Sequence, residues 1–146
     1  MKNYDSPEDR DRAFQKKMRE THDRMMKKYG WYAHYVPGDS DSPTEFNAHT
    51  HGFEESWKHP DVQIVIYMPQ EQLHGILITM ADRVKSGKKY EPGVKYDDVL
   101  RGFPVMFAWA KEGGRKLLRM ILPDKDKGVA PWEIKAPYNI QWEGTE

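Results

Sequence analysis

The 146-residue sequence contains no cysteine. This absence excludes a disulfide framework, a thiol nucleophile, and any zinc or iron–sulfur site with thiolate ligands. An excess of charge of one sign is also missing, because 23 Lys and Arg residues balance 23 Asp and Glu residues. A net charge of zero argues against a general electrostatic grip on nucleic acid or on an anionic membrane. We therefore expect neither nucleic acid nor a membrane as a partner.

Long hydrophobic runs are absent too, since no stretch approaches the roughly 20 apolar residues of a membrane span. The first 20 residues carry many charges of both signs and lack the apolar core of a signal peptide. Together with the lack of cysteine, these features favour a cytoplasmic protein. The sequence also lacks the glycine-rich dinucleotide fingerprint, the phosphate-binding P-loop and the Gly-x-Ser-x-Gly elbow, so it indicates none of those enzyme classes.

The composition is polar but contains enough apolar material for a core. Five Trp, eight Tyr, five Phe and eight Met are too many for a disordered chain. A globular chain of this length buries about 68–70% of its unfolded surface. We therefore expect one domain over residues 1–146, with an N-terminal helix over 6–29 and an irregular C-terminal tail over 125–146.

Two segments have the apolar periodicity of helices. In the first, over residues 6–29, Ser6 can cap the N-terminus, Pro7 fits the first helical position and Gly30 can end the helix. Its apolar stripe is Phe14, Met18, Met25 and Tyr29. A second helix opens after Pro69 and ends at Gly87. Because each helix has a single apolar stripe, we expect both to cover a sheet.

Strand signals occupy much of the remaining chain. They cover residues 31–36, 44–51, 62–68, 103–110 and 115–122, with a short turn or strand at 97–100. The run over 62–68 is apolar on both faces and is therefore expected at the centre of the sheet. Residues 37–43 are predicted as a loop and residues 53–61 as irregular. The sequence thus predicts an α+β fold: a mainly antiparallel sheet of about five strands with two covering helices.

Several short motifs in a fixed order resemble one known family. They are Thr50-His51-Gly52-Phe53, then His59-Pro60-Asp61 leading into residues 62–66, and later Leu122-Pro123-Asp124 followed by Pro131-Trp132. Over roughly residues 29–142, this pattern resembles the bacterial domain-of-unknown-function family 4262. His49, His51, Lys58 and Asp61 depart from the residues usual in that family. The family has no established activity, so the resemblance implies a shared fold and no catalytic residue.

Three histidines are the candidate metal ligands. His49 and His51 are two residues apart on a predicted strand, so both side chains point to one face. His34 lies on the neighbouring predicted strand and can come opposite them. Clustered neutral imidazoles suit Zn²⁺, Ni²⁺ or Cu²⁺, so a divalent metal, Zn or Ni, is the candidate cofactor. Alternatively, these are strand histidines that form only local hydrogen bonds.

A metal-dependent enzyme would also need a base. Candidates are His59 and Glu55, acting on a metal-bound water. His59 has an alternative role, because the imidazole before Pro60 can hydrogen bond to the backbone and tie the loop back.

Arg119 is the candidate binding residue. On its predicted strand it lies between Leu117 and Ile121 on a half-apolar face, where a guanidinium can clamp a carboxylate or phosphate. An internal pair, for example with Asp124, is the alternative. If Arg119 converges with the face of His49 and His51, an anion pocket follows.

Two functions remain open. The first is a small binding or accessory domain for an unidentified small ligand or protein, with a homo-oligomer formed through exposed aromatic residues and the C-terminal tail as an option. The second is a metal-dependent enzyme that uses His34, His49 and His51 as ligands. The substrate, the partner and the biological role are not encoded in any motif.

Overall fold

The structure is a computed structural model that describes residues 6–36, 47–112, 114–124, 127–136 and 138–146. The helices are α1 (Pro7–Tyr29), α2 (Phe53–Trp57) and α3 (Gln70–Lys85), and the short 3-10 helices are η2 (Pro131–Glu133) and η3 (Tyr138–Trp142). The strands are β1 (Tyr32–Val36), β2 (Asn47–His51), β3 (Val62–Ile64), β4 (Tyr96–Leu100), β5 (Phe103–Glu112) and β6 (Arg115–Ile121). None of the described helices is both long and apolar enough to cross a membrane.

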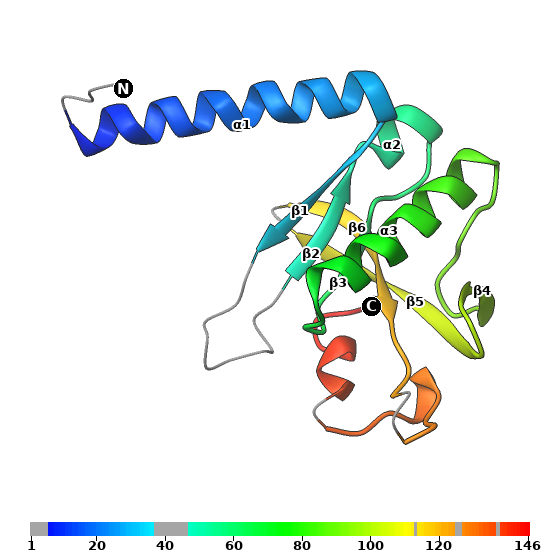
Figure 1. Cartoon of the computed structure of the whole chain (residues 1–146). Helices are drawn as coiled ribbons and strands as arrows, with labels where there is room; N and C mark the ends of the chain where they lie inside the picture. The colour runs from blue at the N-terminus through cyan, green and yellow to red at the C-terminus, as the bar shows by residue number, and fades with distance from the viewer. Residues whose placement is uncertain (1–5, 37–46, 113, 125–126, 137) are drawn as a thin grey trace.

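The described strands form a six-stranded sheet in the order β1-β2-β3-β6-β5-β4 (Figure 1). β3 and β6 are parallel, whereas the other neighbouring strands pair antiparallel. The α+β class is therefore confirmed, in a mixed sheet with one strand more than the five expected. The additional strand is β4, which includes the 97–100 segment and pairs with β5. The parallel pair arises because the chain passes through α3, β4 and β5 before β6 returns beside β3.

The N-terminal helix forms where the sequence predicts it but does not cover the sheet. The Ser6 hydroxyl accepts a hydrogen bond from the Asp9 N–H (3.2 Å), and Gly30 ends the helix in the left-handed conformation (φ 84°). However, α1 buries none of its residues and projects from the body (Figure 1). Phe14 is 59% and Tyr29 54% exposed. The expectation of two covering helices is therefore wrong for α1, because an apolar stripe shows which face is apolar but not what packs on it.

The segments around β2 and β3 differ in detail from the predictions. The predicted loop over 37–43 and the first three residues of the predicted strand over 44–51 lie outside the described residues. Residues 53–61 are not wholly irregular, since they include α2. The carboxylate of Asp61 accepts the first N–H of this helix, from Phe53, at 3.1 Å. β3 has the predicted interior position but ends at Ile64, well before residue 68.

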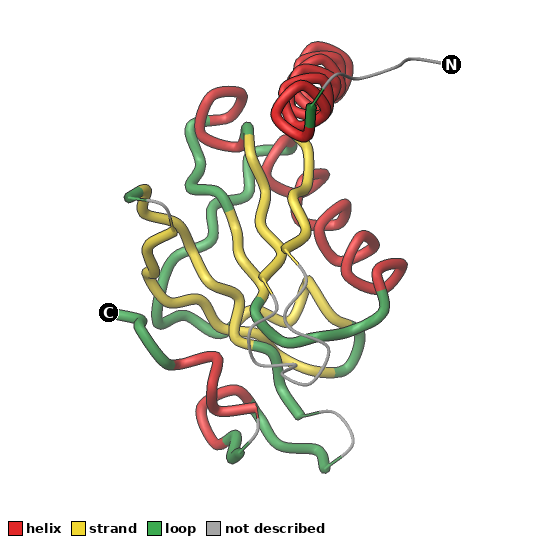
Figure 2. The backbone as a smooth tube through the Cα atoms, turned by 90° about the vertical axis from the view of Figure 1, so that its left-hand side faces the viewer, coloured by secondary structure: helices red, strands yellow, loops and turns green. Residues whose placement is uncertain are grey.

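The main core lies between the sheet and α3, which runs along one face of the sheet (Figure 2). Leu73, Leu77 and Met80 of α3 pack there against side chains from the interior strands. Among the buried sheet residues are Ala48, Val62, Ile64, Phe107, Leu118 and Met120. The helix after Pro69 therefore covers the sheet as predicted.

The C-terminal tail packs on the opposite face and is more regular than expected, because it contains η2 and η3. Ile134 and Trp142 contact Ala108 and Ile121 in a second, smaller cluster. The buried side chain of Gln141 holds the tail to the end of β6: its oxygen accepts the Leu122 N–H (2.7 Å) and its amide donates to the Leu122 carbonyl (3.0 Å). The cluster that the tail forms on this face does not include residues of β1 or β2.

Candidate metal site

The histidine cluster (His34, His49 and His51) lies on the face of the β1–β2 hairpin away from α3. His34 pairs directly with His49 across the hairpin, and His51 is two residues further along β2. The intervening residues point the other way: Ala48 is part of the α3-side core, and Ala33 packs against it. The strand period of two therefore places the three imidazoles on one face, as the sequence predicts.

The three rings lie next to one another. One nitrogen from each ring can be chosen so that all three lie within 4.8 Å of one another. The ring centroids are 4.9 Å apart for His34 and His49, and 4.8 Å apart for His49 and His51. His34 is exposed, His51 is half-buried and His49 is only 4% exposed. The cluster is therefore buried at His49 and open to solvent at His34.

The surroundings of His51 favour its neutral imidazole. Burial is the main cause that lowers the pKa of His51 to about 3, and the positive charge of Arg115 and the neighbouring His49 contribute. A neutral imidazole has a lone pair available for a metal. His51 is therefore in its metal-ligating form near neutral pH.

Second-sphere hydrogen bonds orient His49. Its Nδ1 lies 3.3 Å from the side-chain oxygen of Asn47, which can only accept, so Nδ1–H donates in this contact, and a metal ion held by His49 would bind at Nε2. The same Asn47 oxygen accepts from the amide of Gln63 at 3.2 Å. Such outer partners fix the tautomer and direction of a metal-ligating histidine.

A buried network ties β2 to the chain that follows it. The Asp61 carboxylate accepts hydrogen bonds from the Thr50 hydroxyl (2.7 Å) and from Arg115 (2.8 Å). Arg115 also donates to the Thr50 carbonyl at 2.8 Å, and the Thr50 hydroxyl accepts the Val62 N–H at 3.0 Å. We call Thr50, Asp61 and Arg115 the anchor network. It holds the strand that carries His49 and His51 in a fixed position.

The anchor network joins two of the motifs noted in the sequence, Thr50-His51-Gly52-Phe53 and His59-Pro60-Asp61. A profile of the family described as Domain of unknown function (DUF4262) matches residues 25–137, most of the chain. The chain belongs to this family. No curated protein and no solved structure matches this chain significantly.

The DUF4262 match includes the histidine cluster and the anchor network, but residues 7–24 of α1 lie before it. The contacts give the family-like motifs a structural reason: Thr50 and Asp61 bind each other, and Gly52 lies against the end of α1.

Arg119 lies on the same face of this DUF4262 domain as the histidine cluster. Paired residues place His34, His49, Gln63 and Arg119 in one row across the sheet. The Arg119 guanidinium donates to the Gln63 side-chain oxygen at 2.8 Å and to tail carbonyls, those of Gln141 at 3.1 Å and of Glu143. The structure thus shows Arg119 binding the tail and, through Gln63 and Asn47, contacting the second sphere of His49. Its role as an anion clamp stays a prediction.

The two candidate bases are not among the three clustered histidines. His59 is buried: its Nδ1 donates to the Pro60 carbonyl (2.7 Å) and its Nε2 accepts the Tyr90 N–H (3.0 Å). Burial lowers the pKa of His59. These are the contacts of an imidazole that ties a loop to the backbone. Glu55 is exposed on α2, where its charge acts on Tyr32. A catalytic role for either residue stays a prediction.

Three other residues around the cluster were not predicted from the sequence: His22, Tyr32 and Arg115. The His22 ring of α1 stacks on Tyr32 at 4.0 Å, and Tyr32 stacks on His51 at 5.0 Å. A usable signal existed for Tyr32, which has the same strand parity as His34. His22 depends on where α1 meets the sheet, and Arg115 on the parallel β3–β6 pairing, both of which are long-range features.

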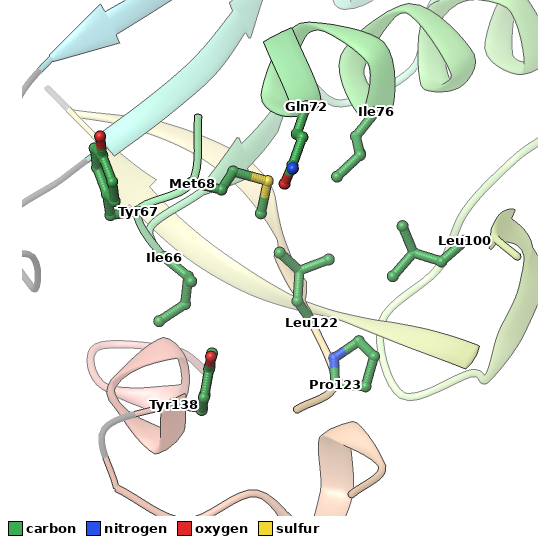
Figure 3. A pocket seen from close by; sticks show the side chains of 9 residues that line it. All are labelled: Ile66, Tyr67, Met68, Gln72, Ile76, Leu100, Leu122, Pro123 and Tyr138. Carbon is green, nitrogen blue, oxygen red and sulfur yellow. The ribbon is translucent and has the colours of Figure 1, made fainter. Parts of the chain in front are cut away.

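A separate pocket of about 240 Å³ lies between α3, β6 and the tail (Figure 3). The side chains of Ile66, Met68, Gln72, Ile76, Leu122 and Tyr138 are among those that line it. None of its lining residues is an acid, a histidine or a lysine, and its polar side chains are those of Tyr67, Gln72 and Tyr138.

Proposed function

We propose that this DUF4262 chain acts as a single binding domain whose histidine cluster holds a divalent metal ion. The observation that supports the proposal is the convergence of one nitrogen from each of His34, His49 and His51 within 4.8 Å. A tetrahedral ion at about 2.0–2.1 Å from each nitrogen needs nitrogen separations of about 3.3 Å. The three nitrogens must therefore move closer together to bind one ion, and the exposed side chain of His34 has room to rotate.

The donor set favours Zn²⁺ or Ni²⁺. Three imidazoles with no carboxylate among them suit borderline transition metals, whereas Ca²⁺ and Mg²⁺ require oxygen ligands. Three protein ligands also leave a fourth coordination position, which here faces the open side of the cluster. A small molecule or the side chain of a partner protein can complete the coordination there.

Binding is favoured over catalysis because of the hydrogen bonds of His59. Both of its ring nitrogens are bound to backbone groups. A general base needs a free nitrogen within about 3 Å of the substrate proton. The metal position on the sheet surface therefore supports a recognition role better than turnover.

The test is metal stoichiometry on protein purified without a histidine tag. After treatment with a chelator, calorimetric titration with Zn²⁺ and then Ni²⁺ should give one site per chain, with elemental analysis of the dialysed complex as a second readout. His34→Ala and His51→Ala should each remove that site. His74→Ala is the matched control, because His74 is an exposed histidine of α3 bonded to Tyr35. No stoichiometric uptake, or uptake unchanged by His34→Ala and His51→Ala together, would contradict the proposal.

A further inference from the structure

A hollow on the α3 side of the sheet brings together two lysines that are far apart in the sequence. Lys58 is the C-cap of α2, and Lys89 lies in the chain that follows α3. Both line an open pocket of about 400 Å³. We call it the lysine pocket; its lining includes Lys58, Pro60, Lys89, Glu91, Pro92 and Trp109. It contains no member of the histidine cluster or of the anchor network, so it is a separate feature of the fold.

The backbone around both lysines is held in place by His59. The Nε2 of this buried ring accepts the Tyr90 N–H at 3.0 Å, which joins the residue after Lys58 to the residue after Lys89. The rings of His59 and Tyr90 also meet edge to face, with centroids 6.1 Å apart. On the α2 side, the Lys58 N–H donates to the Glu54 carbonyl at 3.0 Å. The two lysines therefore reach one pocket through contacts that do not involve their own side chains.

Lys58 has an unusual backbone conformation. Its φ is +55°, and among the residues that the structure describes it is the one residue other than glycine with a positive φ. The other eight positions with a positive φ are all glycine. A side chain in the left-handed region costs free energy that glycine avoids. Because strained residues of this kind concentrate at binding and active sites, we expect the Lys58 side chain to have a role that glycine cannot fill.

The positive charges of the two lysines have no partner within the described part of the chain. Both side chains are exposed, and neither forms an ion pair or a hydrogen bond with a described residue. By contrast, the neighbouring Lys88 pairs with Asp98 at 3.5 Å. Glu91 is the acidic residue of the lining, and it forms no ion pair with either lysine. The pocket lining thus has two lysines against one glutamate, which favours an anion.

The other side of the pocket is aromatic and apolar. Trp109 of β5 lines it together with two prolines. Trp109 has the strand parity of Phe107, which is buried in the core beside α3, so the indole lies on the same side of the sheet. The Lys116 ammonium, itself paired with Glu146, lies 4.5 Å from the centre of this indole ring. A matching ligand therefore combines a flat apolar part with an anionic group.

We propose that the lysine pocket binds a small aromatic anion, which is an aromatic ring that carries a phosphate or a carboxylate. The ring packs against Trp109 and the two prolines, and the anionic group lies between the ammonium groups of Lys58 and Lys89. Each ammonium offers three rotatable donors to the oxygens of the ligand. The site is independent of the proposed metal site, because the two share no residue, so either proposal can fail alone.

The first test is an amide NMR titration of the full chain at constant ionic strength. The probes are phenyl phosphate and benzoate, and the tighter of the two identifies the anionic group. Saturable shifts are expected at the amides of Lys58 and Lys89 and at the Trp109 indole N–H. Inorganic phosphate, which lacks the ring, and phenol, which lacks the anionic group, should each bind at least about tenfold more weakly. No saturable binding of either probe, or equal binding of inorganic phosphate, would overturn the proposal.

The second test uses Lys58→Gly, because this variant separates binding from folding. Glycine adopts a φ of +55° without strain, so the variant should unfold at a higher urea concentration than the native chain. It should nevertheless bind the tighter probe about tenfold more weakly, as should Lys89→Gln. Lys85→Gln is the matched control, because Lys85 is an exposed lysine at the end of α3 that does not line the pocket. Binding that Lys58→Gly and Lys89→Gln leave unchanged, or that Lys85→Gln weakens equally, would refute the assignment.

Discussion

Gly52 offers a quantitative test of how α1 is joined to the hairpin that carries the histidine cluster. It has a φ of +109°, and a Cβ added there would lie 2.5 Å from the Gly30 carbonyl oxygen and 2.9 Å from the Trp31 Cα. Both are backbone atoms that cannot move aside without shifting the end of α1. Gly87, after α3, has nearly the same φ of +104° but nothing within 4 Å of such a Cβ. A comparison of alanine variants at the two glycines therefore separates the effect of backbone strain from that of steric collision.

In both variants the alanine must adopt a positive φ, which lowers the free energy of unfolding by about 1–3 kcal/mol for a residue with a side chain. Only Gly52→Ala also forces atoms into an occupied space, and overpacking typically costs about 1–3 kcal/mol more. We therefore expect Gly87→Ala to lower the free energy of unfolding by about 1–3 kcal/mol and Gly52→Ala by about 2–6 kcal/mol. Against a typical domain stability of about 5–15 kcal/mol, the second loss is severe.

Urea denaturation followed by tryptophan fluorescence measures both variants. Trp31 adjoins the collision, so its emission also reports a displaced α1. Equal slopes of free energy against urea for the two variants show that the comparison is valid. If Gly52→Ala and Gly87→Ala lose the same free energy within about 0.5 kcal/mol, the close approach of α1 to β2 is refuted.

Three further predictions concern the anchor network, acid stability and the metal. Arg115→Met should lower the free energy of unfolding by about 3 kcal/mol, which is at the low end for a broken buried ion pair because the Arg115 side chain is 32% exposed. The control is Arg101→Met, at an exposed arginine, which should change the free energy of unfolding by less than about 0.5 kcal/mol. Equal losses in the two variants would contradict the role of the anchor network. Because burial lowers the pKa of His59 below 6.5, the unfolded chain takes up a proton at this residue before the folded chain does. The contribution of His59 to stability should therefore be complete above pH 6.5 and fall below it by up to about 1.4 kcal/mol per pH unit, in addition to the loss that His51 causes over the same range; urea titrations of His59→Gln should show a shallower dependence on pH than the native chain, and an identical slope would refute this assignment. Zn²⁺ at a hundredfold excess over its dissociation constant should raise stability by about 2.7 kcal/mol in the native chain and not in His34→Ala, and an equal rise in both would place the ion elsewhere.

Local signals predicted local structure well. Ser6, Pro7 and Gly30 mark the ends of α1 because capping depends on neighbouring residues only. The period of two in β2 puts His49 and His51 on one face, and pairing with the neighbouring strand brings His34 to them. The convergence of these histidines could therefore be predicted without coordinates.

Features that depend on distant segments could not be predicted in the same way. Nothing local to residues 62–64 indicates that β3 pairs in parallel with β6, yet this pairing places Arg119 beside Gln63. For Arg119 the alternative to an anion clamp was an internal pair, for example with Asp124, and its hydrogen bonds include those to the Gln63 side chain and to tail carbonyls. The stripe of α1 predicted packing on the sheet, because periodicity does not distinguish an internal contact from a contact with another molecule.

The position of β1 at the edge of the sheet gives the histidine cluster a mechanical consequence. β1 pairs only with β2 in the strand order and is one of the two edge strands, so it can separate from the sheet at a lower cost than an interior strand. His34 belongs to that outer strand, whereas His49 and His51 belong to its inner neighbour. An ion bound by all three histidines would link β1 to β2, and its release would let β1 fray. Deuterium uptake at the amides of Ala33 and Tyr35 would then fall as metal occupancy rises.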